Sequence, residues 1–301
     1  SYNLPQINPF TGQATQIVKM ENNQWAVIVG NGYNSSGGKA VLYVLFMAGG
    51  EDGTWTVGTD YIKLVADSGT GNGLSTPTPF DKNGNGLVDV IYAGDIKGNL
   101  WKFDVSSSTP SSWNVAIGGL PLFVSGTTKP IISPPAVSFH PKKGQLIMFG
   151  TGKYLETADT TNTSTQSIYG LWDLNTPATI TAGMLVQQVM TDATVRTATQ
   201  NQVTYSDTIK GWYINLPVSG ERITGVPMLE DGILLFTTIV PSASPCDFGG
   251  RGFANALDFL TGSMLAFPAF DINRNRVLSL DDGLSAGVEI GFSVGGGTRI
   301  R

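Results

Sequence analysis

A short strand–turn–strand unit recurs four times along the chain, and this repeat constrains the fold more than any other feature of the sequence. In each copy a polar turn precedes a strongly apolar second strand, and a glycine-containing loop then leads to a third, often aromatic strand. The second strands cover residues 25–30, 87–94, 146–150 and 233–238. The third strands cover residues 40–46, 98–104, 168–173 and 253–258. Because the second strands are apolar at nearly every position, both of their faces are expected to be buried.

Repeated units of three or four antiparallel strands are typical of β-propeller blades. Gly30, Gly94 and Gly150 end successive second strands and lie 64 and 56 residues apart, whereas ordinary blades take ~40–50 residues. Long inter-strand loops are therefore expected. We predict an all-β fold in which residues 1–301 form one β-propeller domain, as a partial or modified ring, with a β-sandwich as the alternative. Trp101 and Trp172 occupy matching places in two third strands and are expected to be buried between blades.

The composition agrees with short strands and excludes several functions. Charged residues make up 14% of the chain and there are 38 glycines, against typical values of ~25% charged residues and ~7% glycine. The net charge of −5 without a basic cluster argues against nucleic acid and anionic membranes as partners. The longest apolar run, residues 40–48, is shorter than the ~20 residues of a membrane helix. The chain begins at Ser1 without a leader pattern, so any export signal is expected to be removed or absent.

Oxygen-bearing side chains alternate in the turn of the second hairpin, and this spacing predicts a calcium site. The candidate ligands are Asp81, Asn83, Asn85, the Leu87 carbonyl and Asp89. A glycine follows at the sixth position, where a calcium loop turns sharply. Hard oxygen ligands with two carboxylates suit Ca²⁺ rather than zinc or copper. The closing acid lies at position nine instead of twelve, so the loop differs from an EF-hand, and a plain Asn-Gly turn is the alternative.

A second candidate calcium loop lies near the end of the chain. Its candidate ligands are Asp271, Asn273, Asn275, the Val277 carbonyl and Asp282. Their order follows the twelve-residue calcium loop. However, Arg276 occupies the glycine position, where a positive φ is unfavourable for a residue with a side chain, and Arg274 adds a second cation. A solvated loop without a metal is therefore the alternative here.

Signatures of catalysis are weak, and we predict no catalytic residue. Residues 32–40 approach a phosphate-binding loop but lack its spacing and its Ser/Thr. His140, the single histidine, directly precedes Pro141 in a hairpin turn, and no G-x-S-x-G motif accompanies it. Cys246, the single cysteine, excludes an internal disulfide; it is a free thiol or is paired with a cysteine outside this chain.

Several longer motifs extend through the chain from about residue 13 to residue 282. They comprise residues 25–35, 92–104 (YAGDIKGNLWKFD), 149–155 (FGTGKYL), 166–173 (QSIYGLWD), 211–213 with 220–222, and 241–250. These motifs, in this order, resemble the PilY/PilC family of type IV pilus-associated proteins. The resemblance implies a C-terminal β-propeller of a longer protein, whose variable N-terminal region precedes it.

The resemblance also implies a calcium loop and a place in the pilus system. The family has acidic or amide ligands where Asp81, Asn83, Asn85 and Asp89 stand; an aspartate is frequent at the place of Asn85, so a lower affinity is expected. The second loop resembles a DxNxDG pattern that Arg276 interrupts. Family members support pilus assembly, oppose retraction, and mediate adhesion or surface sensing at the outer surface of Gram-negative bacteria.

The leading hypothesis is a calcium-binding, non-enzymatic type IV pilus factor that supports pilus extension, twitching motility and surface adhesion. Its expected location is the pilus tip, the cell surface or the outer membrane after export, and it has no integral membrane segment. Its expected partners are pilins or minor pilins and host or abiotic surface ligands. The alternative is a quinoprotein-like dehydrogenase that uses calcium and a quinone cofactor. Such enzymes commonly have adjacent cysteines, which a chain with a single cysteine cannot supply. A sugar-binding propeller is a third possibility.

Overall fold

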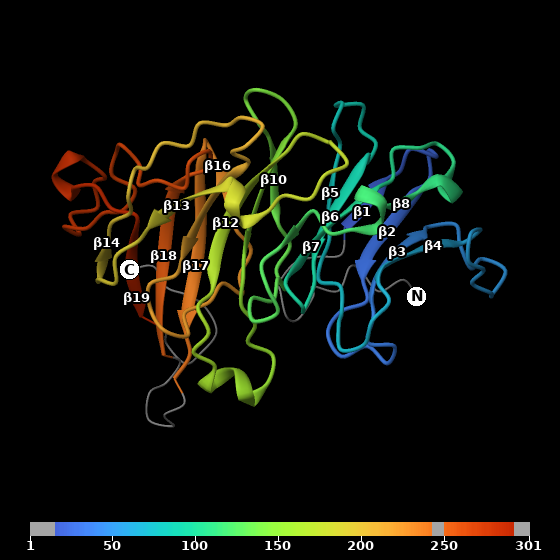
Figure 1. Cartoon of the computed structure of the whole chain (residues 1–301), viewed down its shortest axis with the longest axis horizontal. Helices are drawn as coiled ribbons and strands as arrows, with labels where there is room; N and C mark the ends of the chain where they lie inside the picture. Colours follow the sequence, from blue (N-terminus) through green and yellow to red (C-terminus); the bar gives the residue numbers. More distant parts are fainter. Residues whose placement is uncertain (1–15, 243–249, 292–301) are drawn as a thin grey trace. The chain divides into compact units, whose positions relative to one another are not determined.

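The all-β fold predicted from the repeat is confirmed. The structure, a computed structural model, describes residues 16–242 and 250–291. Within these ranges the regular elements are β-strands and short 3₁₀ helices, without an α-helix (Figure 1). The 3₁₀ helices are η1 (Pro110–Ser112), η2 (Ile117–Gly119), η3 (Thr157–Thr161), η4 (Ala182–Met184) and η5 (Leu280–Asp282).

The strands form four sheets. The first contains β1 (Gln16–Lys19), β2 (Trp25–Gly30), β3 (Ala40–Phe46) and β4 (Tyr61–Asp67) in that order. The second contains β5 (Thr78–Phe80), β6 (Val90–Gly94), β7 (Asn99–Asp104) and β8 (Asn114–Val115), with β9 (Phe123–Val124) also paired to β7. The third has the order β10 (Ala136–Phe139), β11 (Gln145–Gly150), β12 (Ser167–Asp173), β15 (Gly211–Asn215), β13 (Leu185–Val189). The fourth has the order β14 (Val195–Arg196), β19 (Gly287–Gly291), β18 (Arg251–Asp258), β17 (Ile233–Val240), β16 (Met228–Glu230).

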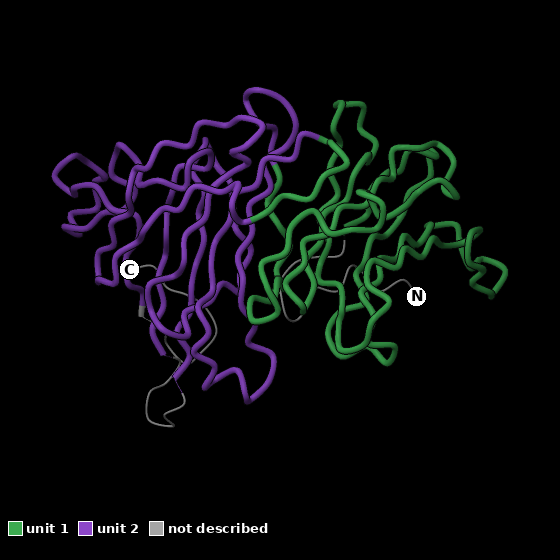
Figure 2. Tube along the Cα trace, in the orientation of Figure 1, with its two compact units in different colours: residues 1–137, 175–181 green, residues 138–174, 182–301 purple. Residues whose placement is uncertain are grey.

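Each predicted unit forms three consecutive antiparallel strands of one sheet. The predicted hairpins are β1–β2, β5–β6, β10–β11 and β16–β17, and the predicted third strands are β3, β7, β12 and β18. The chain divides into two compact units, shown in Figure 2: residues 1–137 with 175–181, and residues 138–174 with 182–301. The first two sheets belong to unit 1. The last two belong to unit 2, except that the first two residues of β10, Ala136 and Val137, lie in unit 1.

In unit 1 the first two sheets pack face to face. Their core cluster joins Ile28 and Leu42 of the first sheet to Ile91 and Phe103 of the second, and it includes Trp101. The Trp101 indole is 4% exposed, and its Nε1 donates to the buried Asp95 carboxylate at 2.8 Å. The predicted burial of Trp101 between blades is therefore confirmed.

Trp172 is also buried, at 5% exposure, but its surroundings differ from those of Trp101. Its ring contacts His140 and Tyr205, with centroid separations of 4.7 and 5.3 Å. In unit 2 it is Trp212, in β15 of the third sheet, that reaches the fourth sheet: its Nε1 donates to the carbonyl of Phe259, just beyond β18, at 3.0 Å. The burial predicted for Trp172 is confirmed, whereas matching sequence positions do not give matching contacts.

The prediction that all second strands are buried on both faces is only partly correct. Every residue of β6 and β11 is buried. In β2 and β17, by contrast, buried positions such as Ala26 and Leu234 alternate with exposed or half-buried ones, and Trp25 is 55% exposed. Successive side chains of a strand point to opposite faces of the sheet. Only one face of β2 and of β17 is therefore fully covered, and the other is partly exposed.

The glycines that end three of the second strands lie against another part of the chain. A Cβ built on Gly30 would stand 2.2 Å from the Ser75 carbonyl oxygen, and one on Gly150 would stand 2.4 Å from the Ile223 side chain. For Gly94 the corresponding distance to the Ile131 side chain is 2.2 Å. None of these separations accommodates a side chain, so the recurring glycine is a packing requirement.

We expect Gly150→Ala to lower the free energy of unfolding by about 1–3 kcal/mol, because the added methyl group overpacks the contact with Ile223. Urea titration monitored by tryptophan fluorescence measures this loss. Gly183→Ala is the matched control, since nothing lies within 4 Å of a Cβ at Gly183. An equal loss in both variants would contradict the close-approach explanation.

We expect Trp101→Ala to cost about 3–5 kcal/mol, because it opens a cavity between the two sheets of unit 1. Trp25→Ala removes the same side chain from an exposed position, where a change within about 0.5 kcal/mol is expected. Chemical denaturation of both variants tests the difference. Similar losses would show that Trp101 is not a core residue.

Candidate calcium-binding loops

The first candidate loop, residues 81–89, connects β5 to β6 and is organised by the carboxylate of Asp81. One oxygen, Oδ1, accepts hydrogen bonds from the backbone N–H groups of Asn83 at 3.0 Å and Gly84 at 2.7 Å. The other, Oδ2, accepts from the N–H of Gly86 at 2.6 Å. The chain therefore curls around the first predicted ligand.

The remaining predicted side-chain ligands continue this pattern. Asn83 Oδ1 accepts from the Asn85 N–H at 3.0 Å, and Asn85 Oδ1 accepts from the Leu87 N–H at 2.8 Å. The closing residue, Asp89, is 4% exposed, and its Oδ2 accepts from the Lys82 N–H at 2.7 Å. The structure thus brings the last predicted ligand back to the beginning of the loop.

The second candidate loop, residues 271–282, reproduces three of these hydrogen bonds at equivalent positions, whereas its first and closing carboxylates accept their other bonds from different positions. Asp271 Oδ2 accepts from the N–H of Arg276, five residues on, at 2.8 Å, as Asp81 Oδ2 does from Gly86. Asn273 Oδ1 accepts from Asn275 at 3.0 Å, and Asn275 Oδ1 accepts from Val277 at 2.7 Å. The closing Asp282 returns to the loop start, because its Oδ1 accepts from the Asn273 N–H at 3.1 Å.

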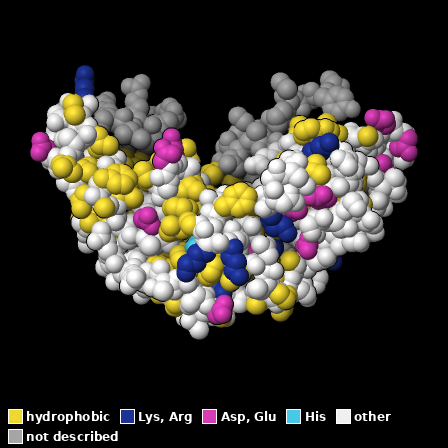
Figure 3. Space-filling view, turned by 90° about the horizontal axis from the view of Figure 1, so that it is seen from above, with side chains coloured by type: hydrophobic (Ala, Val, Ile, Leu, Met, Phe, Trp, Pro, Cys, Tyr) yellow, Lys and Arg dark blue, Asp and Glu magenta, His cyan; other side chains and the backbone are white. Residues whose placement is uncertain are grey.

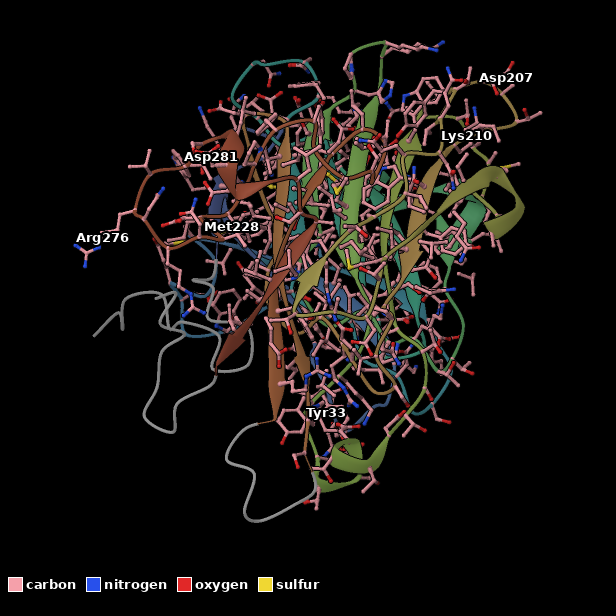
Figure 4. All side chains as sticks on the ribbon, turned by 90° about the vertical axis from the view of Figure 1, so that its left-hand side faces the viewer. Tyr33, Asp207, Lys210, Met228, Arg276 and Asp281 are labelled. Carbon is pink, nitrogen blue, oxygen red and sulfur yellow. The ribbon has the colours of Figure 1, made fainter. Side chains whose placement is uncertain are left out.

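The backbone conformations of the two loops also correspond. Gly84 and Gly86, at positions four and six, have φ of 77° and 84°. Arg274 and Arg276, at the same positions of the second loop, have φ of 61° and 68°. A positive φ costs an ordinary residue roughly 1–2 kcal/mol, and the second loop adopts it nevertheless. Both arginines are exposed, and Figure 4 shows Arg276 pointing away from the sheets.

Both loops keep negative charge available at neutral pH. Burial alone would raise the pKa of Asp81, but the backbone N–H groups of Gly86 and Gly84 more than offset it and lower the pKa below the ordinary value. The pKa of Asp282 is lowered by the N–H groups of Ser279 and Asn273. A carboxylate has about four lone-pair sites, so oxygens that accept backbone N–H groups retain capacity for a cation.

The donor set of both loops consists of hard oxygens. Among the described residues, no group of three or more His, Cys, Asp and Glu side chains is placed to hold a metal ion. A cation in either loop would therefore require amide and backbone carbonyl oxygens beside two carboxylates, as in the predicted ligand sets. Such oxygens suit Ca²⁺ and are poor ligands for soft transition metals.

Sequence reasoning missed one neighbour of the first loop. Asn85 Nδ2 donates to Glu21 Oε1 at 3.3 Å, so a carboxylate from the β1–β2 turn adjoins the loop. Glu21 opens a polar turn in the sequence, but nothing in that pattern shows which distant loop the turn meets.

His140, for which no catalytic role is predicted, is part of an aromatic cluster. Its Nδ1 accepts from the Lys142 N–H at 3.2 Å, and its ring lies 4.7 Å from Trp172 and 4.4 Å from Tyr205 between centroids. Figure 3 shows Lys and Arg side chains gathered beside the histidine. These contacts agree with a structural turn histidine. Cys246 lies outside the described residues.

Comparisons with known proteins identify the same family as the sequence motifs. A family model described as the PilY1 beta-propeller domain matches residues 8–206. The type IV pilus biogenesis factor PilY1 of Pseudomonas aeruginosa (strain PAO1) is 34% identical over 87% of this chain and 26% of its own length. A PilY1 homolog of Xylella fastidiosa is 34% identical over 82% of this chain and 18% of its own length.

A solved structure supports the same assignment. The crystal structure of the Pseudomonas aeruginosa PilY1 C-terminal domain matches with a TM-score of 0.78 and 30% identity, over 96% of this chain and 68% of that one. The fold is therefore a modified β-propeller of pilus-associated proteins. The chain belongs to the PilY1 β-propeller family. It spans about a quarter or less of the length of the full-length relatives described above.

His140 provides a test of pH dependence. Burial, and then the charge of Lys142, lower its pKa below the ordinary 6.5. The unfolded chain therefore binds a proton at a higher pH than the folded protein does, and stability falls as the pH drops below 6.5. We expect His140→Phe to flatten the pH dependence of the unfolding free energy between about pH 7 and pH 5. An unchanged slope would contradict a neutral, buried imidazole.

Proposed function

We propose that this chain is the calcium-binding propeller domain of a non-enzymatic type IV pilus factor, which supports pilus assembly and extension, twitching motility and surface adhesion. The observation that carries the proposal is the shared geometry of the two loops, in a chain of the PilY1 family. Residues 1–301 form the C-terminal part of a longer exported protein at the pilus tip, cell surface or outer membrane. Its partners are pilins or minor pilins, and host or abiotic surfaces.

In the main site, Asp81, Asn83, Asn85, the Leu87 carbonyl and Asp89 hold Ca²⁺. The hydrogen bonds at Asp81 and Asp89 support this assignment, because they fix the first and last ligands before a cation arrives. Two carboxylates balance the double positive charge of the ion. Calcium orders this hairpin and sets the conformation that pilus partners contact.

The second site uses Asp271, Asn273, Asn275, the Val277 carbonyl and Asp282. Three of its hydrogen bonds and its positive φ angles at positions four and six match those of the first loop, which supports it. Arg274 and Arg276, both exposed, bring two cations near the ion, and they lower the affinity although the Arg276 side chain points outward. We therefore propose that the second loop binds calcium more weakly than the first.

The non-enzymatic role is supported by the names of the relatives and by the chain's own residues. The relatives are described as pilus biogenesis factors. The single histidine is enclosed by aromatic rings, and a single cysteine cannot form the adjacent pair typical of the quinoprotein alternative.

In the described ranges, no helix is long and apolar enough to cross a membrane.

We expect Ca²⁺ to raise the free energy of unfolding of the domain by about 0.4–1.4 kcal/mol at millimolar concentration. This gain follows from binding to the folded state alone with a Kd of about 10⁻⁴–10⁻³ M, as in extracellular calcium modules. It is too small to hold the domain together, so chelation is expected to loosen the loop without unfolding the sheets. Isothermal titration calorimetry and thermal melts with and without EDTA measure both effects.

The controls separate the two loops and connect the main site to function. Asp89→Asn keeps a hydrogen-bond acceptor for the Lys82 N–H but removes the charge, and it is expected to abolish the tighter binding event. Asp271→Asn with Asp282→Asn is expected to remove only the weaker one. Introduced into the full-length pilus protein, Asp89→Asn is expected to reduce surface pili and twitching at normal protein levels. Equal calcium binding by wild type and by the Asp81→Ala, Asp89→Ala double variant would refute the main site.

A further inference from the structure

Four asparagines in the chain are followed directly by glycine, and two of them belong to the first calcium loop. The four pairs are Asn31-Gly32, Asn72-Gly73, Asn83-Gly84 and Asn85-Gly86. A glycine has no Cβ, so its backbone nitrogen is unshielded and can attack the amide carbon of the preceding asparagine. Asparagine is for this reason a chemically labile residue, and the surrounding structure decides which pair reacts.

The two pairs outside the loop are held by contacts with distant segments. Asn31 Nδ2 donates to Ser35 Oγ at 2.7 Å and to the Lys39 carbonyl at 2.6 Å. Its Oδ1 accepts from the N–H groups of Val41 and Leu74, both at 2.9 Å. Moving the Asn31 amide onto the next nitrogen would break all four bonds.

Asn72 is held as firmly. It is 3% exposed, and its Nδ2 donates to the carboxylates of Asp67 and Asp95, both at 2.8 Å. The Gly73 N–H, which would supply the attacking nitrogen, donates to Asn72 Oδ1 at 2.9 Å. Reaction at this pair requires opening of the unit 1 interior.

The two loop pairs are exposed and depend almost entirely on the loop itself. Asn83, Gly84, Asn85 and Gly86 are all exposed. Gly84 and Gly86 donate to Asp81, and each asparagine Oδ1 accepts from a residue two positions on. The Asn83 Nδ2 donates to Asp89 Oδ1, at the end of the same loop, at 3.4 Å, and the side-chain contact by which these four residues reach outside the loop is the 3.3 Å bond from Asn85 to Glu21. Local opening therefore frees both amides without disturbing a sheet, and local openings cost far less free energy than global unfolding.

We propose that Asn83-Gly84 and Asn85-Gly86 form a self-modification site, which deamidates in the native protein when the loop is free of calcium. The Gly84 nitrogen attacks Asn83 Cγ; an N–Cγ bond forms, the Cγ–Nδ2 bond breaks and ammonia leaves, giving a succinimide. Water then opens the ring at either carbonyl, yielding aspartate or isoaspartate. No oxidation or reduction occurs. The Gly86 nitrogen and Asn85 react in the same way.

The link to calcium rests on the proposed function, since Asn83 and Asn85 are proposed ligands. A bound cation holds both amide oxygens and the Asp81 carboxylate in place, so it closes the loop and slows the reaction. The products change the site in opposite directions. Aspartate adds a carboxylate and strengthens calcium binding. Isoaspartate lengthens the backbone by one methylene group, so the ligands no longer lie at alternate positions with the same spacing.

Peptide mapping by mass spectrometry tests the proposal on the 301-residue chain incubated at neutral pH with EDTA or with calcium. Deamidation replaces the amide NH₂ by OH, and the resulting mass change reports the reacted fraction of each asparagine. In EDTA we expect this fraction to be several-fold higher at Asn83 and Asn85 than at Asn31 and Asn72. With calcium we expect the fraction at Asn83 and Asn85 to fall several-fold. In guanidinium all four pairs are expected to react at similar rates, which would show that the fold protects Asn31 and Asn72. Asn85→Asp, which makes one product directly, is expected to bind calcium several-fold more tightly than wild type.

The outcomes distinguish this proposal from the proposed function. Equal reaction at all four pairs of the native protein in EDTA would overturn the self-modification site. Calorimetric calcium binding at the loop without any protection from reaction would overturn the calcium link. Selective reaction at Asn83 and Asn85 with no calorimetric binding would support the modification site and refute the calcium-binding function instead.

Discussion

The close approach between the end of a second strand and the segment that leads to the next sheet is the constraint on which the rest of the structure depends. At Gly30 and Gly94 the space available to a Cβ is already filled by Ser75 and Ile131. The same segments are hydrogen-bonded to one another, since the Ser75 N–H donates to the Gly94 carbonyl at 2.9 Å and Ser75 Oγ donates to the Ile131 carbonyl at 2.6 Å. The contact therefore requires glycine, and its recurrence makes the repeat visible in the sequence.

The low charge of the chain gives special weight to the charges that are buried. Arg196 and Glu221 are both fully buried and form a paired contact, with distances of 2.7 and 2.9 Å between their atoms. The Arg196 guanidinium also lies over the Phe253 ring, and Thr238 donates to Glu221. Removing one partner of such a pair leaves an uncompensated charge that costs about 3–5 kcal/mol. This pair therefore links the short strand β14 to the buried interior of unit 2, in addition to the backbone pairing of β14 with β19.

The parts of the structure that sequence reasoning predicted are those with local causes. The strand–turn–strand units and the buried tryptophans follow from apolar patterning, and the curled conformations of loops 81–89 and 271–282 follow from side chains that bond to their own backbone. The remaining features have distant causes. The parallel pairing of β13 with β15 joins segments separated by an insertion, Trp172 takes its environment from Tyr205, and Glu21 reaches Asn85 from another hairpin. The arginines in the second loop show a further limit: the Asx hydrogen bonds outweigh the preference for glycine, so residue identity at position six does not decide the loop conformation.

The energies involved also indicate where calcium can act. A gain of about 0.4–1.4 kcal/mol from a millimolar-affinity site is small beside the ~3–5 kcal/mol of a buried tryptophan. Calcium bound as proposed would therefore change the population of loop conformations but not that of the fold. Residues 81–89 reach the first hairpin in two places: the Val88 N–H donates to the Lys19 carbonyl at 3.0 Å, and the Asn85 side chain donates to Glu21. Asn85 is thus at once a proposed ligand and the contact to the β1–β2 turn. A bound cation that draws its amide oxygen inward also repositions the nitrogen that faces Glu21, so the turn of the first sheet is the place where we expect calcium occupancy to be transmitted beyond the loop.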